Sequence, residues 1–337
     1  MHLGARLRSS LYPTMTRYII RRLLIAVPVL WGIITLTFII SEIMPGDYVD
    51  ALVPPGLRLE MGVDEAQLQR LRESYGLDKP VVIRYLIWLR ELLLHGNLGY
   101  SFVTGQPALQ EMAQVLPATL QLSVVTILFS LVVGTSLGIV SAIKQYSVLD
   151  HLLTLQAFVW ISTPGFVFAI IALYLFSLKL PLFPTGGRAP LDGPDNFLVR
   201  LHYLALPALV LGFEGLAGHM RYARASLLEA LGADYVRTAR AKGLPERSVY
   251  LGHAFRNSLL PVITIVGLSL PGIIGGSFII ETIFVWPGMG KLGMESVFMR
   301  NQPMIMAMNL IGSSMVLFAN LLADITYAWA DPRIRYE

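Results

Sequence analysis

Long apolar stretches alternate along the chain with polar connections that contain Gly and Pro. A membrane-spanning helix needs about 20 predominantly apolar residues. Spanning helices are predicted at residues 15–41, 116–143, 152–178, 203–220, 258–283 and 302–328. The fourth of these stretches is the weakest candidate, because Glu214 and His219 lie near its end. In the third stretch, Pro164-Gly165 predicts a kink.

The first apolar stretch is interpreted as a spanning helix rather than a cleaved signal peptide. Its apolar part is too long for a signal peptide, and no small-residue cleavage site follows between Glu42 and Asp47. Residues 1–14 are expected to be a non-structural extension. The sequence therefore predicts an all-α membrane protein whose core occupies residues 116–337.

The placement of Lys and Arg predicts that both termini are cytoplasmic, since short cytoplasmic loops carry an excess of these residues. Without the fourth span, the basic segment 221–257 would lie outside. The short outer loops carry only Lys179, Arg188, Arg200, Lys291 and Arg300. The segments assigned to the cytoplasm carry Arg6, Arg8, Arg17, Arg21, Arg22, Lys144, Arg221, Arg224, Arg237, Arg240, Lys242, Arg247, Arg256, Arg333 and Arg335.

The long outer segment, residues 42–115, predicts a small helical domain. Asp64 and Gln67 form a capping-box pattern for a helix that stops at Gly76. A second helix is predicted from Pro80 through Leu94 and is ended by Gly96. The apolar residues of this second helix favour a position on the membrane surface or on the bundle, and docking of a partner is the alternative.

Composition agrees with a membrane protein. Charged residues make up 14% of the chain and hydrophobic residues 55%, whereas soluble proteins carry about 25% charged residues. The mean hydropathy is +0.61. The absence of cysteine excludes disulfides, thiolate metal sites and cysteine nucleophiles. The histidines show no metal-ligand spacing, and the basic segment lacks the aromatic residues of single-strand binders, so neither a metal site nor nucleic-acid binding is predicted.

The basic segment between the fourth and fifth spans contains a predicted short helix. Asp234 is placed to cap a helix over Tyr235–Lys242, Gly243 to end it and Pro245 to begin the next one. Its small side chains would let it enter a groove, and its cations would hold it on an acidic rim of a soluble motor protein. An ordinary basic cytoplasmic loop is the alternative. The small and cationic residues are Val236, Thr238, Ala239, Ala241, Arg237, Arg240 and Lys242.

This segment resembles the coupling loop, or EAA loop, of binding-protein-dependent ABC importers. The sequence DYVRTARAKGL over Asp234–Leu244 and the sequence HAFRNSLLP over His253–Pro261 are most similar to the dipeptide/oligopeptide/nickel permease family. The Glu-Ala-Ala of the wider superfamily would fall on Arg237-Thr238-Ala239, and its glycine on Gly243. This departure from the acidic residue is typical of the peptide branch.

The resemblance covers nearly the whole chain from Met15. Tyr48 replaces a common Pro, Asn97 replaces a common Asp, and Arg300-Asn-Gln-Pro303 departs from the usual Arg-Asp-Tyr-Pro. Because of the last departure, the details of the family's outer gate are not carried over to this chain, whereas the family resemblance is unaffected. The matching motifs, in order, are Pro45-Gly46-Asp47, Tyr75–Pro80, Gly96–Gly99, Glu281–Gly288 and Asp331–Arg335.

The resemblance implies the fold of a type I ABC importer permease, in a bacterial or archaeal cytoplasmic membrane. It implies a non-catalytic, pore-forming subunit for di- or oligopeptides, with nickel or another small solute of the same family as the alternative. The implied partners are a second permease, two ATPases, an external binding protein and membrane lipid. The second permease is expected to be a different homologous chain, and a homodimer is left open.

The chain lacks the phosphate-binding loop of an ATPase, since Gly290-Lys291 stands in the wrong context. ATP and Mg are therefore expected on the ATPase subunits, and this chain itself is expected to hold no cofactor. The residues that the resemblance assigns to ATPase coupling are Asp234, Tyr235, Val236, Arg237, Thr238, Ala239, Arg240, Ala241, Lys242, Gly243 and Leu244.

Polar residues inside the predicted spans are candidates for the translocation path, because charges in hydrocarbon are costly. Hydrogen bonding between packed helices is the alternative for each. Asp324 is expected near the cytoplasmic interface, and Glu281 near the outer end. The candidates for the path are Glu214, His219, Asn309 and Asn320.

The alternative functions are an intramembrane serine protease and an ion-driven secondary carrier. For the protease, Gly134-Thr-Ser-Leu-Gly138 matches G-x-S-x-G, but that motif needs a strand-to-helix turn. Here it lies inside a predicted span, where Gly134 and Gly138 are better explained by close helix packing. An ion-driven carrier would suit the Pro164-Gly165 kink, but no carboxylate lies in that helix.

Overall fold

The computed structural model describes residues 15–58, 60, 62–190, 192–250 and 278–330. In these ranges the regular structure is helical, with one isolated antiparallel bridge between Tyr100 and Pro107. Four helices are long and apolar enough to cross a membrane, or five if one bent pair is a single span. The predicted fifth span, 258–283, lies outside the described residues except for its end.

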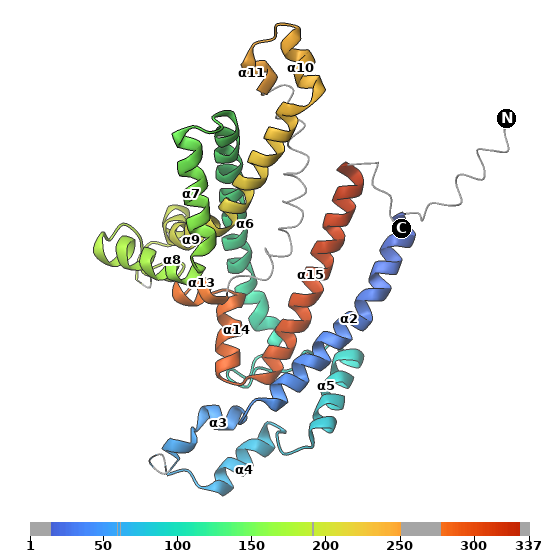
Figure 1. Cartoon of the computed structure of the whole chain (residues 1–337). Coiled ribbons are helices and arrows are strands. Elements are labelled where there is room, and N and C mark those ends of the chain that lie inside the picture. The colour runs from blue at the N-terminus through green and yellow to red at the C-terminus, as the bar shows by residue number, and fades with distance from the viewer. Residues whose placement is uncertain (1–14, 59, 61, 191, 251–277, 331–337) are drawn as a thin grey trace, which may run out of the picture. The chain divides into compact units, whose positions relative to one another are not determined.

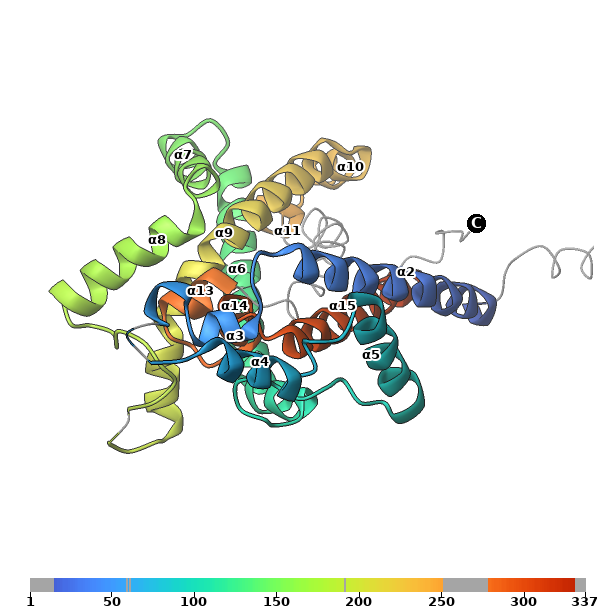
Figure 2. The same ribbon diagram turned by 90° about the horizontal axis from the view of Figure 1, so that it is seen from below.

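The described chain runs through the helices shown in Figure 1 and, turned by 90°, in Figure 2. Two short segments between them have other helical geometry, 3-10 over Pro55–Leu57 and π over Leu173–Lys179. The α-helices are α2 (Met15–Ile43), α3 (Tyr48–Leu52), α4 (Glu65–Ser74), α5 (Val81–His95), α6 (Ala108–Ile143), α7 (Val148–Ser162), α8 (Gly165–Ala172), α9 (Phe197–Gly232), α10 (Asp234–Ala241), α11 (Glu246–Ser248), α13 (Phe278–Ile283), α14 (Met289–Phe298) and α15 (Gln302–Ala330).

The chain forms two compact units. Among the described residues, the first lies within 15–117, 291–321 and 328–330, and the second within 118–250, 278–290 and 322–327. In the first unit α2, α5 and α15 lie side by side (Figure 1), because Ile34, Phe38 and Met306 form a buried cluster against one face of α5. The opposite face of α5 is exposed. The helix thus packs on other helices of its own unit, and the outer position expected for it stays a prediction.

Local capping signals position the outer helices as predicted. The Asp64 side chain accepts from the backbone N–H of Gln67, whose side chain accepts in return from the Asp64 N–H, so α4 begins with a complete capping box. Gly76 follows α4 with φ 68°, and Gly96 ends α5 with φ 63°. Pro80 directly precedes α5. These boundaries lie within one or two residues of the predicted ones.

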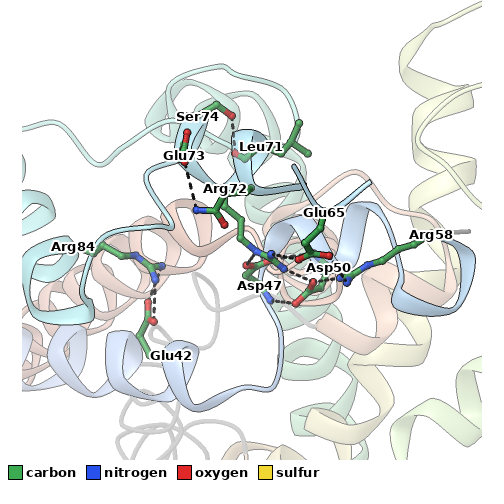
Figure 3. Close-up of polar contacts among 11 residues, drawn as sticks. Glu42, Asp47, Asp50, Arg58, Glu65, Leu71, Arg72, Glu73, Ser74 and Arg84 are labelled. Carbon is green, nitrogen blue, oxygen red and sulfur yellow. Dashed lines mark hydrogen bonds and ion pairs between the residues drawn. The ribbon is translucent and has the colours of Figure 1, made fainter. Parts of the chain in front are cut away.

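An ionic cluster that no local sequence pattern predicts connects α3, α4 and the segment between them (Figure 3). Arg72 donates from Nε to Asp47 at 2.8 Å and from Nη2 to Asp50 at 2.9 Å, and Arg58 donates to Asp50 at 2.6 Å. Asp47 also caps α3. Burial raises the pKa of Asp47, but hydrogen bonds from Arg72 and from the backbone N–H groups of Asp50 and Val49 outweigh burial and leave that pKa below its usual value.

In the second unit α6 and α9 approach each other through small residues. A β-carbon added at Gly138 would lie 2.9 Å from the Ala223 Cβ, so α6 fits closely against α9. The Ser136 hydroxyl donates to the carbonyl of Val132 in its own helix. The packing interpretation of the G-x-S-x-G sequence is therefore confirmed.

The predicted kink at Pro164-Gly165 is a sharp break. The two helices on either side of it, α7 and α8, are bent by 102°, and Figure 2 shows them diverging. Pro164 has no N–H to donate and disfavours helical geometry at Thr163, whose ψ is 124°. The break therefore follows from the local sequence.

Candidate coupling and translocation sites

The helix α9 extends well beyond its predicted span. The span was expected to end at Met220, but the helix continues through Gly232. The sequence between them, RYARASLLEALG, is rich in good helix formers and contains nothing that stops a helix before its last residue. The first part of the loop predicted at 221–257 is thus a continuation of the helix α9. The helices α10 and α11 follow the end of α9 (Figure 1).

The short helix α10 closely matches the predicted one. It begins at Asp234 itself rather than after it, and Ala233 takes the N-cap position with no side-chain cap. The prediction that Asp234 caps the helix is therefore wrong by one position. The helix ends before Gly243, whose φ of 75° favours glycine, and the Gly243 N–H donates to the Arg240 carbonyl.

One face of α10 packs against the chain's own helices. Val236 is fully buried and Ala239 nearly so, in a cluster with Leu227 of α9, Ala142 of α6 and Val249. Residues three apart share a face of a helix, which explains why these two turn inward together. We expected their small side chains to enter a partner's groove, but they are covered within this chain.

The opposite face of α10 and the turn after it are exposed. Arg240 lies there and donates to both carboxylate oxygens of Glu246, at 2.9 and 3.2 Å. The hydrogen bond from Arg240 lowers the pKa of Glu246. The similar segment His253–Pro261 lies outside the described residues. The exposed face consists of Asp234, Tyr235, Arg237, Thr238, Arg240, Ala241, Lys242, Gly243 and Leu244.

The candidates for the path in the second unit lie on α9 and differ in burial. Glu214 is exposed, and its Oε2 would lie 3.4 Å from a β-carbon at Gly165, beside the break between α7 and α8. In the described part of the chain no ion pair or hydrogen bond reaches its carboxylate. His219 is buried, with Nδ1 2.8 Å from the Gly215 carbonyl oxygen. Its Nε2 has no hydrogen-bond partner among the described residues.

The other two candidates lie on α15, in the first unit. Asn309 is exposed, and its amide donates back to the carbonyl of Ile305 in the same helix at 3.0 Å. Asn320 is half-buried. The side chain of Asp324 lies outside the described residues.

Glu281 is fully buried in a polar network that the sequence analysis did not foresee. The Thr119 hydroxyl donates to one carboxylate oxygen at 3.1 Å, and the Gly290 N–H donates to the other at 2.7 Å. The Thr119 oxygen accepts in turn from the Met289 N–H at 2.7 Å. At Gly290 a β-carbon would lie 2.9 Å from the carboxylate. The sequence signal for this buried, hydrogen-bonded carboxylate is a Glu followed closely by Pro-Gly-Met-Gly, here residues 287–290.

Two departures from the usual Arg-Asp-Tyr-Pro pattern have structural roles. The Asn301 side chain accepts from the Phe102 N–H at 3.0 Å and donates to the Ser101 hydroxyl at 2.9 Å. Gln302 accepts from Arg84 at 2.5 Å and donates to Glu42 at 2.7 Å. Asn301 therefore connects the start of α15 to the turn at Ser101 and Phe102, and Gln302 connects it to α2 and α5 of the same unit.

Comparison with protein families decides the assignment. The family described as binding-protein-dependent transport system inner membrane component matches residues 134–336. The family of N-terminal membrane components of the same systems matches residues 15–123. The chain belongs to this permease family. The resemblance inferred from the motifs is therefore confirmed, and the permease is a multi-pass inner-membrane protein.

Individual relatives match the permease over nearly its whole length. It is 42% identical over 323 residues to the oligopeptide transport system permease protein AppB of Bacillus subtilis, which covers 96% of this chain and 100% of the relative. It is 35% identical over 344 residues to the dipeptide transport system permease protein DppB of Escherichia coli, covering 96% and 100%. A probable D,D-dipeptide transport system permease protein, DdpB of Escherichia coli, is 37% identical, covering 90% and 93%.

A solved structure shares the fold of the permease. A chain from inward facing conformations of the MetNI methionine ABC transporter matches with a TM-score of 0.51 and 13% identity. The match covers 66% of this chain and 97% of that chain. The helical architecture is thus that of an ABC importer permease.

Proposed function

We propose that the permease is the pore-forming subunit of an ATP-driven importer of di- and oligopeptides. The observation that carries the proposal is the match over 96% of the chain to permeases named for oligopeptide and dipeptide transport. The absence of a phosphate-binding loop supports a non-catalytic subunit that depends on separate ATPases. ATP and Mg would be bound by those ATPases rather than by this chain.

The proposed topology has six spans with both termini in the cytoplasm. Four helices and the bent pair α7–α8 supply five of these spans by length and composition, and residues 258–283 would supply the remaining one. The excess of Lys and Arg in the segments assigned to the cytoplasm supports the direction. In this topology α10 faces the cytoplasm and residues 42–115 form an outer domain.

The exposed face of α10 is proposed to dock on an ATPase subunit. Arg237, Arg240 and Lys242 give this face a positive charge that suits an acidic rim, and Ala241 and Gly243 leave room for close approach. The buried Val236 and Ala239 would attach α10 firmly to α9 and α6. Closure of the ATPases would thereby move these helices and switch the pore between inward-open and outward-open states.

The remaining partners follow from the same assignment. A second permease, expected to be a different homologous chain, would complete the pore, and an external binding protein would deliver the peptide to the outer domain. Glu214, His219, Asn309 and Asn320 are proposed as polar positions of the path. Glu214 has the strongest support, because an exposed carboxylate in an apolar span must face water, a cation or another protein chain.

Reconstitution tests this function. The permease is co-expressed with its native partner chains, purified and incorporated into vesicles with the external binding protein outside. ATP-dependent uptake of radiolabelled di-, tri- and pentapeptides, without any ion gradient, is the expected result. Uptake of nickel alone, uptake driven only by an ion gradient, or a purified complex without an ATP-hydrolysing chain would contradict the proposal.

A further inference from the structure

An ion pair between a buried carboxylate and a half-buried arginine joins α7 to α9 at the end of the second unit that carries α10. Arg224 of α9 donates from Nε to one carboxylate oxygen of Asp150 and from Nη2 to the other, both at 2.9 Å. Asp150 lies in the first turn of α7 and is only 3% exposed. Two parallel hydrogen bonds between planar groups fix orientation as well as distance.

Further donors saturate the same carboxylate. The Ser141 hydroxyl, near the end of α6, donates to Asp150 and accepts from Arg224 Nε at 3.1 Å. The backbone N–H of Tyr146, in the turn between α6 and α7, donates to Asp150 at 2.9 Å. A buried carboxylate with this many donors is held in a single geometry. One residue therefore ties together the end of α6, the turn after it, α7 and α9.

This junction lies close to the attachment of α10. Leu227, three residues after Arg224, packs against Val236 of α10, and Ala142, next to Ser141, belongs to the same apolar cluster. The polar junction and the apolar cluster thus share two helices, α6 and α9. Arg224 and Leu227 lie within one turn of α9, so a displacement of α10 would be transmitted to both the ion pair and the apolar cluster.

We propose that Asp150 and Arg224 are positioning residues that make α7 move together with α10 when the ATPases close. The inference rests on the proposed function, because it takes α10 as the ATPase contact. The break at Thr163–Gly165 separates α7 from α8, and α8 packs against the first part of α9 around Leu206 and Val210. Motion of the end of α9 that carries Arg224 can therefore move α7 without moving α8 equally. The ion pair thereby converts motion of α10 into a change at the bend of the third span.

The ratio of peptide imported to ATP hydrolysed in reconstituted vesicles tests this role. The probe is the radiolabelled peptide that the wild-type complex takes up best. Asp150→Asn keeps the shape of the side chain but removes its charge, and we expect the ratio to fall by about fivefold or more, which is typical of a lost coupling between sites. The double variant Asp150→Arg/Arg224→Asp restores the charge pair in reverse, and we expect it to recover part of the ratio.

The matched control is Arg200→Gln, at the other end of α9. Arg200 also pairs with an aspartate, Asp195, through both carboxylate oxygens, but this pair is exposed and distant in sequence from α10. We expect the control to keep the wild-type ratio. An unchanged ratio in Asp150→Asn, or an equal fall in the control, would overturn the inference.

A distance measurement covers the case in which Asp150→Asn reduces assembly. The chain has no cysteine, so spin labels can be attached after Leu152→Cys on α7 and Ala233→Cys at the N-cap of α10, outside the proposed docking face. In the complex that forms, the distance should stay constant between nucleotide-free and ATP-trapped states with Asp150 present, and should change between these states in Asp150→Asn. A distance that behaves alike in both backgrounds would refute the link. A wild-type complex that neither hydrolyses ATP nor imports peptide would instead refute the proposed function.

Discussion

The backbone of Leu216 occupies the space that a side chain at Gly134 would need. A β-carbon there would lie 2.7 Å from the Leu216 carbonyl oxygen and 2.9 Å from the His219 Cβ. Contacts this short force the two helices apart, because backbone atoms cannot move aside as a side chain can. The distance between α6 and α9 therefore depends on the absence of a single methyl group.

We expect Gly134→Ala to destabilise the permease by about 1–3 kcal/mol, as overpacking of a close-packed interior does. Thermal unfolding of the purified complex measures the effect. Gly218→Ala is the matched control on α9, since no atom lies within 4 Å of its added carbon. The control should be neutral or slightly stabilising, because Ala favours a helix over Gly. Equal melting temperatures for the two variants would contradict the packing described above.

Ala241→Trp should block docking on the ATPase without affecting insertion into the membrane. Ala241 is exposed at the end of α10, so the described part of the chain leaves it open to solvent, and a large side chain there would clash with a closely fitting partner. We expect the affinity for the ATPase to fall about tenfold or more, equivalent to 1.4 kcal/mol or more. Co-purification at graded ATPase concentrations gives the measurement.

The matched control is Ala225→Trp, at an exposed position of α9. It adds the same bulk outside the proposed docking face and should leave ATPase binding unchanged. Ala239→Trp is unsuitable as a test of docking, because Ala239 is buried against this chain's own helices. Gly243→Trp is also less direct, since its positive φ would strain any other residue. Normal ATPase binding by Ala241→Trp would mean that α10 docks elsewhere.

The segment of residues 44–77, which contains α3 and α4, should lose stability in acid through Asp47. The pKa of this carboxyl is lowered in the folded protein, so its contribution is complete above the ordinary pKa of an aspartate and is lost as the pH falls through the lowered pKa. Hydrogen exchange of residues 44–77, measured from pH 5 downward in the intact complex and divided by the intrinsic rate at each pH, should show falling protection as the carboxyl is protonated. Asp47→Asn should be less protected at pH 5 already, and its protection should depend less on pH. A variant with the wild-type pH profile would exclude Asp47 as the source.

Glu281→Ala should destabilise the permease more than Glu281→Gln. Alanine leaves the Gly290 N–H and the Thr119 hydroxyl without their carboxylate acceptors, at about 1–3 kcal/mol for each buried donor left unpaired. Glutamine keeps one oxygen for Gly290 and can donate its amide to the Thr119 oxygen. The expected order of melting temperatures is wild type, Gln, Ala. The reverse order of the two variants would mean that the negative charge itself is unfavourable there.

Glu214→Gln should lower peptide uptake while leaving assembly and stability unchanged. The carboxylate is exposed within an apolar span and is not reached by a hydrogen bond in the described part of the chain, so its loss removes no internal support. Initial uptake rates in vesicles, with complex yield as the control, make the comparison. A fall in yield equal to the fall in uptake would instead indicate a contact with another subunit.

Features encoded within a few neighbouring residues could be predicted from the sequence. The capping box of Asp64 and Gln67, the glycine stop at Gly243 and the break at Pro164-Gly165 each depend on local backbone chemistry, and each lies where it was expected. The end of α9 was missed, because the end of an apolar stretch is not the end of a helix when good helix formers follow it.

Features that depend on tertiary contacts could not be predicted. The helix α10 was found, but its inward face was not, because the burial of Val236 depends on Ala142 and Leu227 of other helices. Asp150 and Arg224 are 74 positions apart, and no local pattern connects them. Glu281 and Thr119 are separated by 162 positions. Hydrophobic patterning gives the spans but not which polar residues meet between them.

The length of α9 beyond Pro207 sets the precision that the transporter requires. The 25 residues from Ala208 to Gly232 are about 38 Å long, at 1.5 Å per residue. Tilting such a lever arm by one degree moves the end that carries α10 by about 0.7 Å. A small rotation within the span is therefore amplified to nearly atomic dimensions where α10 begins, so modest rotations of the membrane helices would be enough to follow the closure of an ATPase.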